Sequence, residues 1–117
     1  MKRIVLVIMV CVLLSGCGKK QEASSDTGYK AISCSDITSD MVLVDVRTKE
    51  EYDEGHIEGS INVPLDSINE DEMTSFDKDK KIVLYCRSAA RSSEAAKLLV
   101  SMGFINVYDL GAMSNCN

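Results

Sequence analysis

Two predominantly apolar runs, at residues 41–46 and 81–86, dominate the hydrophobic pattern of the chain. Neither run alternates between polar and apolar positions, which is typical of strands covered on both faces in a parallel sheet. Shorter apolar runs predict three further strands at 29–32, 61–64 and 106–110. Proline at position 64 would close the second of these, because it cannot donate a hydrogen bond within the sheet.

Helical spacing is found between these runs. Apolar residues at 95, 98, 99 and 102 predict a helix over 92–102, which Gly103 would end. Thr48 can cap a short acidic helix through residues 50–52. A more polar, less regular helix is predicted over 65–76. The alternation of strands and helices predicts an α/β domain with a mainly parallel sheet, whose sites lie at the carboxyl ends of the strands.

The first sixteen residues have the pattern of a targeting segment. Two basic residues precede an apolar run over 4–14, which is too short to span a bilayer. The following Leu14-Ser15-Gly16-Cys17 resembles the lipobox of bacterial lipoproteins. That resemblance implies a signal peptide over 1–16, cleaved after Gly16, and lipidation of Cys17. A simple secretory signal with a chance cysteine, or an uncleaved anchor, is the alternative.

This interpretation places the protein on the extracytoplasmic face of a bacterial cell membrane. It would be held there by acyl chains such as palmitate, because its acidic body is not attracted to anionic lipid. Residues 17–28 are small and polar and predict a flexible tether, which leaves a domain over 29–117.

Composition narrows the function classes. The chain has 117 residues, enough for one domain, and a formal net charge of −5, which argues against a nucleic-acid partner. It contains a single histidine, which argues against zinc sites built on imidazole. The acidic run at 50–54 lacks the ligand spacing of a calcium loop. We therefore expect no metal and no cofactor.

Reactive chemistry is concentrated in residues 86–91, Cys-Arg-Ser-Ala-Ala-Arg, which connect a buried strand to a predicted helix. Such a loop directs backbone N–H groups and the positive end of the helix dipole inward. Together with Arg87 and Arg91, these groups would favour the thiolate of Cys86 without a general base and would hold an anion. The alternative is an inert, buried cysteine in an ordinary turn.

Three segments make the domain resemble the single-domain rhodaneses, a family of sulfurtransferases. These are residues 45–64 (DVRTKEEYDEGHIEGSINVP), 86–91 (CRSAAR) and 109–113 (DLGAM). The resemblance implies a five-stranded, mainly parallel sheet flanked by helices. It implies that Cys86 takes sulfane sulfur from a small anion such as thiosulfate, becomes a persulfide and passes the sulfur to a thiol or cyanide.

The resemblance also assigns roles to other residues. Backbone N–H groups of Arg87, Ser88, Ala89, Ala90 and Arg91 would cradle the bound anion, and Arg91 would close the loop. Asp45 and Arg47 would support the base of the loop.

The chain departs from the family pattern at two places. Ala89 stands where the family often has glycine, which would cost roughly 1 kcal/mol if that residue needs a positive φ. At the carboxyl end, Ala112 replaces the second glycine of the closing motif and Cys116 stands where a tryptophan is common. Part of the sheet end would lack its hydrophobic cover.

Cleavage would remove Cys11 and leave Cys34, Cys86 and Cys116 beside the lipidated Cys17. In the family's strand order the first and last strands are neighbours, so Cys34 and Cys116 can form a disulfide that replaces the missing tryptophan. Alternatively both are free, or Cys116 resolves the Cys86 persulfide.

Two further function classes remain open beside the sulfurtransferase. A phosphatase or arsenate reductase would use a larger Cys-x5-Arg loop, whereas this loop is Cys-x4-Arg. A non-enzymatic persulfide carrier or binding module would keep the fold without turnover. We expect a monomer in each case.

Overall fold

The computed structural model describes residues 27–116. The predicted signal peptide, Cys17 and residues 18–26 of the predicted tether lie outside this range. A five-stranded sheet forms the centre of the domain, in the order β1-β5-β4-β2-β3, and every pairing is parallel. The strands are β1 (Lys30–Ala31), β2 (Val42–Asp45), β3 (Ile61–Asn62), β4 (Ile82–Cys86) and β5 (Val107–Ala112). The predicted fold class is confirmed.

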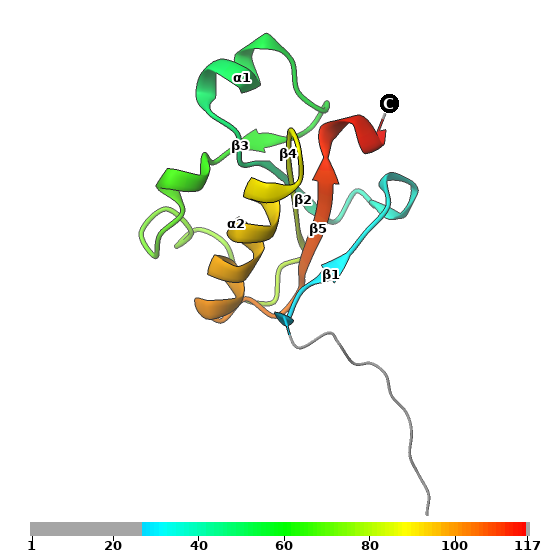
Figure 1. The fold of residues 1–117 in the computed structure, drawn as a ribbon. Helices are drawn as coiled ribbons and strands as arrows, with labels where there is room; N and C mark the ends of the chain where they lie inside the picture. The colour runs from blue at the N-terminus through cyan, green and yellow to red at the C-terminus, as the bar shows by residue number, and fades with distance from the viewer. Residues whose placement is uncertain (1–26, 117) are drawn as a thin grey trace, which may run out of the picture.

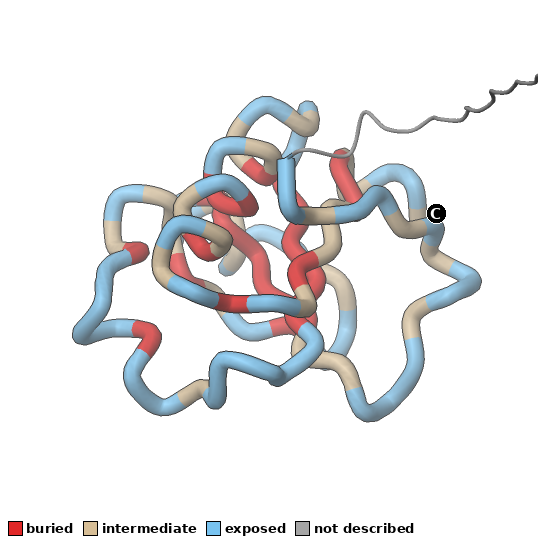
Figure 2. The backbone as a smooth tube through the Cα atoms, turned by 90° about the horizontal axis from the view of Figure 1, so that it is seen from below, coloured by how far each residue is buried: buried red, intermediate tan, exposed pale blue. Residues whose placement is uncertain are grey.

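Helix α2 (Ala90–Ser101) packs across one face of the sheet (Figure 1). Its buried residues Ala95, Ala96 and Leu99 belong to the larger apolar cluster, which also contains the inward residues of β2 and β4, Val44, Ile82, Leu84 and Cys86 among them. All five residues of β4 are buried, as its uninterrupted apolar run predicts. Figure 2 shows the buried positions gathered in the middle of the domain.

The opposite face of the sheet carries a smaller cluster formed by Leu43, Val83, Tyr85 and Leu110. No long helix of the described residues covers it. Two short 3-10 turns pack there instead, η3 (Cys34–Asp36) and η5 (Met113–Cys116), with Cys34, Met113 and Cys116 against the cluster. One face of the sheet is therefore covered by a long helix and the other by short turns.

The helix predicted over 65–76 is wrong. The structure has a 3-10 turn η4 (Leu65–Ser67) followed by turns. Asn69 Oδ1 accepts from the backbone N–H of Glu72, and the Thr74 hydroxyl donates to the carbonyls of Glu70 and Asp71. Short polar side chains that bond to the nearby backbone offer it an alternative to the helical ladder.

The short acidic helix is present as α1 (Lys49–Glu54), capped by Thr48 as predicted. Within the described part of the chain, no helix is both long and apolar enough to cross a bilayer. The last residues of the predicted tether touch the domain, since a Cβ on Gly28 would meet the side chain of Val100 on α2.

Candidate active site

Cys86 is the last residue of β4, and the sequence Arg87-Ser88-Ala89 carries the chain from it into α2. The side chain is a free thiol and exposes 0% of its surface. Strand and helix are both buried against the same cluster, so the loop between them is fixed at both ends. Cys86 therefore lies where the sequence predicts it, at the carboxyl end of a central parallel strand.

Two backbone N–H groups donate to the sulfur of Cys86. The Ala89 nitrogen lies 2.9 Å from Sγ and the Ser92 nitrogen 3.3 Å from it. Ser92 is the third residue of α2, and the residue before the helix, Ala89, provides no capping side chain. The sulfur thus occupies the role of a helix cap, where backbone N–H groups and the helix dipole favour negative charge.

Ala89 has a left-handed backbone conformation, the case in which replacing a family glycine carries a cost. Its φ is 80° and its ψ −18°, and it is the one non-glycine residue with positive φ in the described range. This conformation turns its N–H toward Cys86 and brings its Cβ against Gly111 on β5, where an added Cβ would lie 3.6 Å away. Ala89 therefore keeps its N–H directed at Cys86, and its left-handed backbone is strained as a result.

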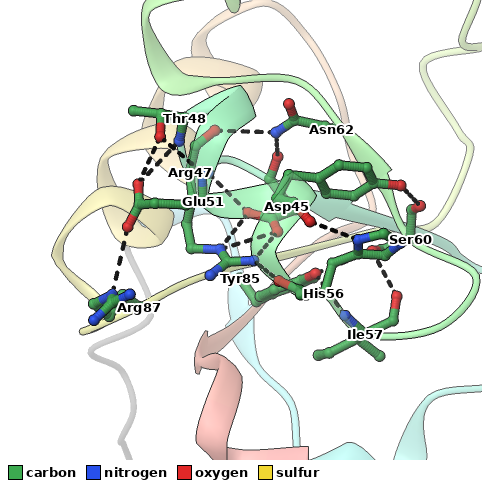
Figure 3. A network of polar contacts seen from close by, with 12 residues as sticks. Asp45, Arg47, Thr48, Glu51, His56, Ile57, Ser60, Asn62, Tyr85 and Arg87 are labelled. Carbon is green, nitrogen blue, oxygen red and sulfur yellow. Dashed lines mark hydrogen bonds and ion pairs between the residues drawn. The ribbon is translucent and has the colours of Figure 1, made fainter.

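Both loop arginines contact one carboxylate that the sequence reasoning did not single out, that of Glu51 on α1. Arg91 binds it through two hydrogen bonds, Nη1–Oε1 at 2.7 Å and Nη2–Oε2 at 3.0 Å. Arg87 Nε lies 3.4 Å from Oε2 (Figure 3). The two positive charges expected from Arg87 and Arg91 are therefore accompanied by one negative charge, that of Glu51.

Glu51 is held in place by its own helix. Its Oε1 also accepts from the backbone N–H and the hydroxyl of Thr48, and its backbone N–H donates to that hydroxyl, which completes a capping box. The hydrogen bonds from Arg91 and Thr48 hold the pKa of Glu51 well below its usual range, and the pKa of Arg91 is raised by the same pair. The Thr-x-x-Glu spacing at 48–51 was the available sequence signal.

Asp45 and Arg47 form a buried ion pair at the end of β2, with side chains 0% and 2% exposed. Arg47 Nη2 lies 2.7 Å from Asp45 Oδ2 and also donates to the Gly55 carbonyl at 2.6 Å. The hydrogen bonds that Arg47 donates to the Asp45 carboxylate raise the pKa of Arg47. Removing one partner of such a pair typically costs roughly 3–5 kcal/mol. The pair fixes the chain that leads from β2 into α1.

The segment after α1 is anchored to the strand that carries Cys86. The Tyr85 hydroxyl accepts from the Ile57 backbone N–H and lies 3.0 Å from the Ser60 hydroxyl (Figure 3). His56 stacks on Tyr52 and its Nδ1 lies 2.8 Å from the Tyr52 carbonyl, so the histidine serves the turn rather than the sulfur.

A small cavity of about 110 Å³ lies beside the loop. Its walls come from the strand ends and from the start of α2, and they are Val46, Thr48, Pro64, Leu65, Asp66 and Arg91. Cys86 is not in the wall, but Arg91 and Thr48 both bind Glu51. The cavity therefore lies next to the Glu51–Arg91 pair, and Asp66 contributes to its lining.

Cys34 and Cys116 are joined by a disulfide with a Cα–Cα distance of 5.2 Å. It links η3 to η5 over the smaller apolar cluster, at the place where a larger side chain was expected to be missing. Asn115 donates to the Leu110 carbonyl and holds the same turn against β5. Across residues 27–116, no three side chains of the His, Cys, Asp and Glu types gather as a metal site would need.

A family model described as "Rhodanese-like domain" matches residues 26–114. Among solved structures, rhodanese with anions from E. coli is 32% identical with a TM-score of 0.60, and the match covers 64% of this chain and 89% of that one. The rhodanese-like domain of the Anabaena sp. Alr3790 protein is 28% identical with a TM-score of 0.62, over 66% and 59% of the two chains.

Curated relatives are longer proteins. The tRNA uridine(34) hydroxylase of Photorhabdus laumondii is 40% identical over 74 residues, which are 59% of this chain and 21% of that protein. The protein of the same description from Yersinia pestis is 39% identical with the same coverage. The chain thus spans about a fifth of the length of the curated relatives it matches.

Proposed function

This chain belongs to the family of rhodanese-like domains, and from that premise we propose that it is a sulfurtransferase with Cys86 as its nucleophile. The observation that carries the proposal is the pair of backbone N–H groups, from Ala89 and Ser92, that converge on the Cys86 sulfur at the start of α2. Donors in that position stabilise a thiolate and, after it has reacted, the anionic outer sulfur of a persulfide.

The proposed reaction has two displacements. The Cys86 thiolate attacks the sulfane sulfur of a donor such as thiosulfate, the donor's S–S bond breaks, and sulfite leaves with the electron pair. An acceptor thiolate or cyanide then attacks the outer sulfur of the Cys86 persulfide. The bond between the two sulfurs breaks, the Cys86 thiolate is restored, and a new persulfide or thiocyanate is released.

In this proposal the loop residues bind the donor anion through their backbone N–H groups and through the charge of the two arginines. Ser88 and Ala90 belong to the cradle with Arg87, Ala89 and Arg91, and Asp45 with Arg47 supports its base through the buried pair. Because Cys86 exposes no surface in the resting structure, the loop must open far enough for the donor sulfur to reach Sγ. The similarity to the E. coli rhodanese that was solved with anions supports an anionic donor.

A thiosulfate–cyanide assay on wild type and Cys86→Ser tests the proposal. We expect thiocyanate from the wild type and none from the variant, with circular dichroism showing that both are folded. Hydrolysis of p-nitrophenyl phosphate without thiocyanate would favour the phosphatase class. No turnover in either assay would contradict the enzyme and favour a carrier or binding module.

We further propose that the domain is held at the extracytoplasmic face of a bacterial membrane through lipid on Cys17, on the strength of the Leu-Ser-Gly-Cys sequence alone. Metabolic labelling with palmitate and cell fractionation test this. Label and membrane association should both be lost in Cys17→Ser. Equal membrane association of the two proteins would refute the proposal.

A further inference from the structure

We propose that Glu51 determines which donors the loop accepts. By pairing with both loop arginines, it leaves a single net positive charge at the site, which suits a singly charged persulfide (R–S–S⁻) better than a doubly charged oxyanion. The inference rests on the proposed sulfur transfer for its substrate class, but its charge argument applies to any anion that binds the loop.

The geometry divides the two arginines into different roles. Arg91 is one third exposed and its two terminal nitrogens both donate to Glu51, so its planar fork is already occupied by a carboxylate. Arg87 is 68% exposed and its Nε is 3.4 Å from Glu51 Oε2, a longer contact. Arg87 is therefore the guanidinium that is free to turn toward a bound anion, while Arg91 stays with Glu51.

The charges near the loop follow from these contacts. Arg87 and Arg91 contribute two positive charges and Glu51 one negative charge. Glu51 stays ionised at neutral pH, because Arg91 and Thr48 both donate to it. Asp66 lines the adjoining cavity together with Arg91 but is not among the groups paired with either arginine. A dianion entering this site meets a net positive charge of one, and its second negative charge is repelled by the carboxylate of Glu51.

A designed set of three variants separates charge from helix structure. In Glu51→Gln the carboxylate charge is lost, but glutamine at this position still completes a capping box with Thr48. Glu50→Gln removes the same charge from the neighbouring residue of α1, which is exposed and outside the arginine contacts. Arg87→Gln removes the more exposed and more weakly paired positive charge and leaves the Glu51–Arg91 pair in place.

The first measurement is the binding of inorganic sulfate at low ionic strength, followed through the amide NMR shifts of residues 87–92. Relative to wild type, we expect Glu51→Gln to bind sulfate on the order of tenfold more tightly and Arg87→Gln on the order of tenfold more weakly. Glu50→Gln should bind like the wild type. The inference is overturned if Glu51→Gln binds sulfate no more tightly than Glu50→Gln does.

The second measurement is donor selectivity, the ratio of kcat/KM for thiosulfate to kcat/KM for the persulfide of 2-mercaptoethanol. The only charge of that persulfide is on its terminal sulfur. We expect Glu51→Gln to raise this ratio on the order of tenfold and Glu50→Gln to leave it unchanged. A purely structural role for Glu51 would lower both rates together and leave the ratio as it was, which would refute the inference.

The two measurements also separate the inference from the proposed function. If the wild type takes sulfur from neither donor, the sulfurtransferase proposal fails, and the sulfate titration still decides the role of Glu51. If sulfur transfer is present but sulfate affinity and donor ratio do not respond to Glu51→Gln, the inference alone fails. Should Glu51→Gln not fold, the sulfate affinity of Arg87→Gln tests the same charge account from the opposite direction.

Discussion

At the scale of single residues, the site is a set of backbone donors arranged around one sulfur. The sequence was sufficient to place Cys86, because a buried apolar run that ends in Cys-Arg and leads into a helix leaves few other positions for it. The family resemblance was also sufficient to flag Ala89 as a position where a positive φ would be costly, and the structure has that φ at 80°. It did not indicate Ser92 as a donor, because the predicted helix began at that residue, whereas α2 begins two residues earlier.

Replacing Ala89 with glycine should therefore stabilise the fold. Glycine adopts a φ of 80° without the Cβ clash that costs other residues about 1 kcal/mol. For a domain of this size, that gain corresponds to a rise in Tm of roughly 4–8 °C, less the unfolded-state entropy that glycine adds. Thermal unfolding of Ala89→Gly measures it, with Ala90→Gly, which lies in helical backbone, as the matched control. A lower Tm for Ala89→Gly than for the wild type would contradict this view of the loop.

At the scale of elements, α1 and α2 are joined by the Glu51–Arg91 contact, although 40 residues separate the two side chains in sequence. The capping motif of α1 was recognisable through Thr48, but its pairing with the loop depends on where the sheet places both helix starts. The helix predicted over 65–76 failed for a local reason, since Asn69 and Thr74 bond to nearby backbone instead of leaving it to the helix.

The Glu51–Arg91 contact should make stability depend on acid pH. A carboxyl with a lowered folded-state pKa contributes stability that is fully present above its unfolded pKa, about 4.3, and is lost as the pH falls through its folded pKa. We expect wild type to exceed Glu51→Gln by about 1 kcal/mol in free energy of unfolding above about pH 5. The difference should shrink progressively below about pH 4.

Urea unfolding of wild type and Glu51→Gln, at a series of pH values from about 2.5 to about 7, measures this difference in the free energy of unfolding. The series includes pH values above and below the unfolded pKa of glutamate. Glu50→Gln serves as the control for removing a charge from α1 without breaking the pair. A difference between wild type and Glu51→Gln that stays constant down to the lowest pH would show that the contact does not respond to ionisation of Glu51.

At the scale of the whole molecule, the two faces of the sheet are stabilised by different means. α2 covers the larger cluster, whereas the smaller cluster is closed by two 3-10 turns that a disulfide joins. The fold class followed from the uninterrupted strands and from three matching segments. The sequence did not predict how the second face of the sheet is covered. It left two alternatives for Cys34 and Cys116, a disulfide or free thiols.

Loss of the disulfide should destabilise the domain strongly. It closes a loop with a sequence separation of 82 residues, for which the chain-entropy model gives about 4 kcal/mol. We expect reductant to lower the Tm of the wild type by on the order of 15 °C, and the double variant Cys34→Ser/Cys116→Ser to unfold at this lower temperature with or without reductant.

Cys86→Ser controls for any effect of reductant at the free thiol of Cys86 and should show the same fall in Tm as the wild type. An unchanged Tm of the wild type after full reduction, verified by thiol counting, would mean that the linkage between η3 and η5 contributes nothing to the fold.

Transfer of one sulfur atom to Cys86 is the central claim, and mass spectrometry of the native protein after incubation with thiosulfate tests it most directly. The non-reduced peptide that contains Cys86 should gain about 32 Da, the mass of one sulfur, and cyanide should remove that gain as thiocyanate. A Cys86 peptide of unchanged mass, or a gain confined to other cysteines, would contradict the account.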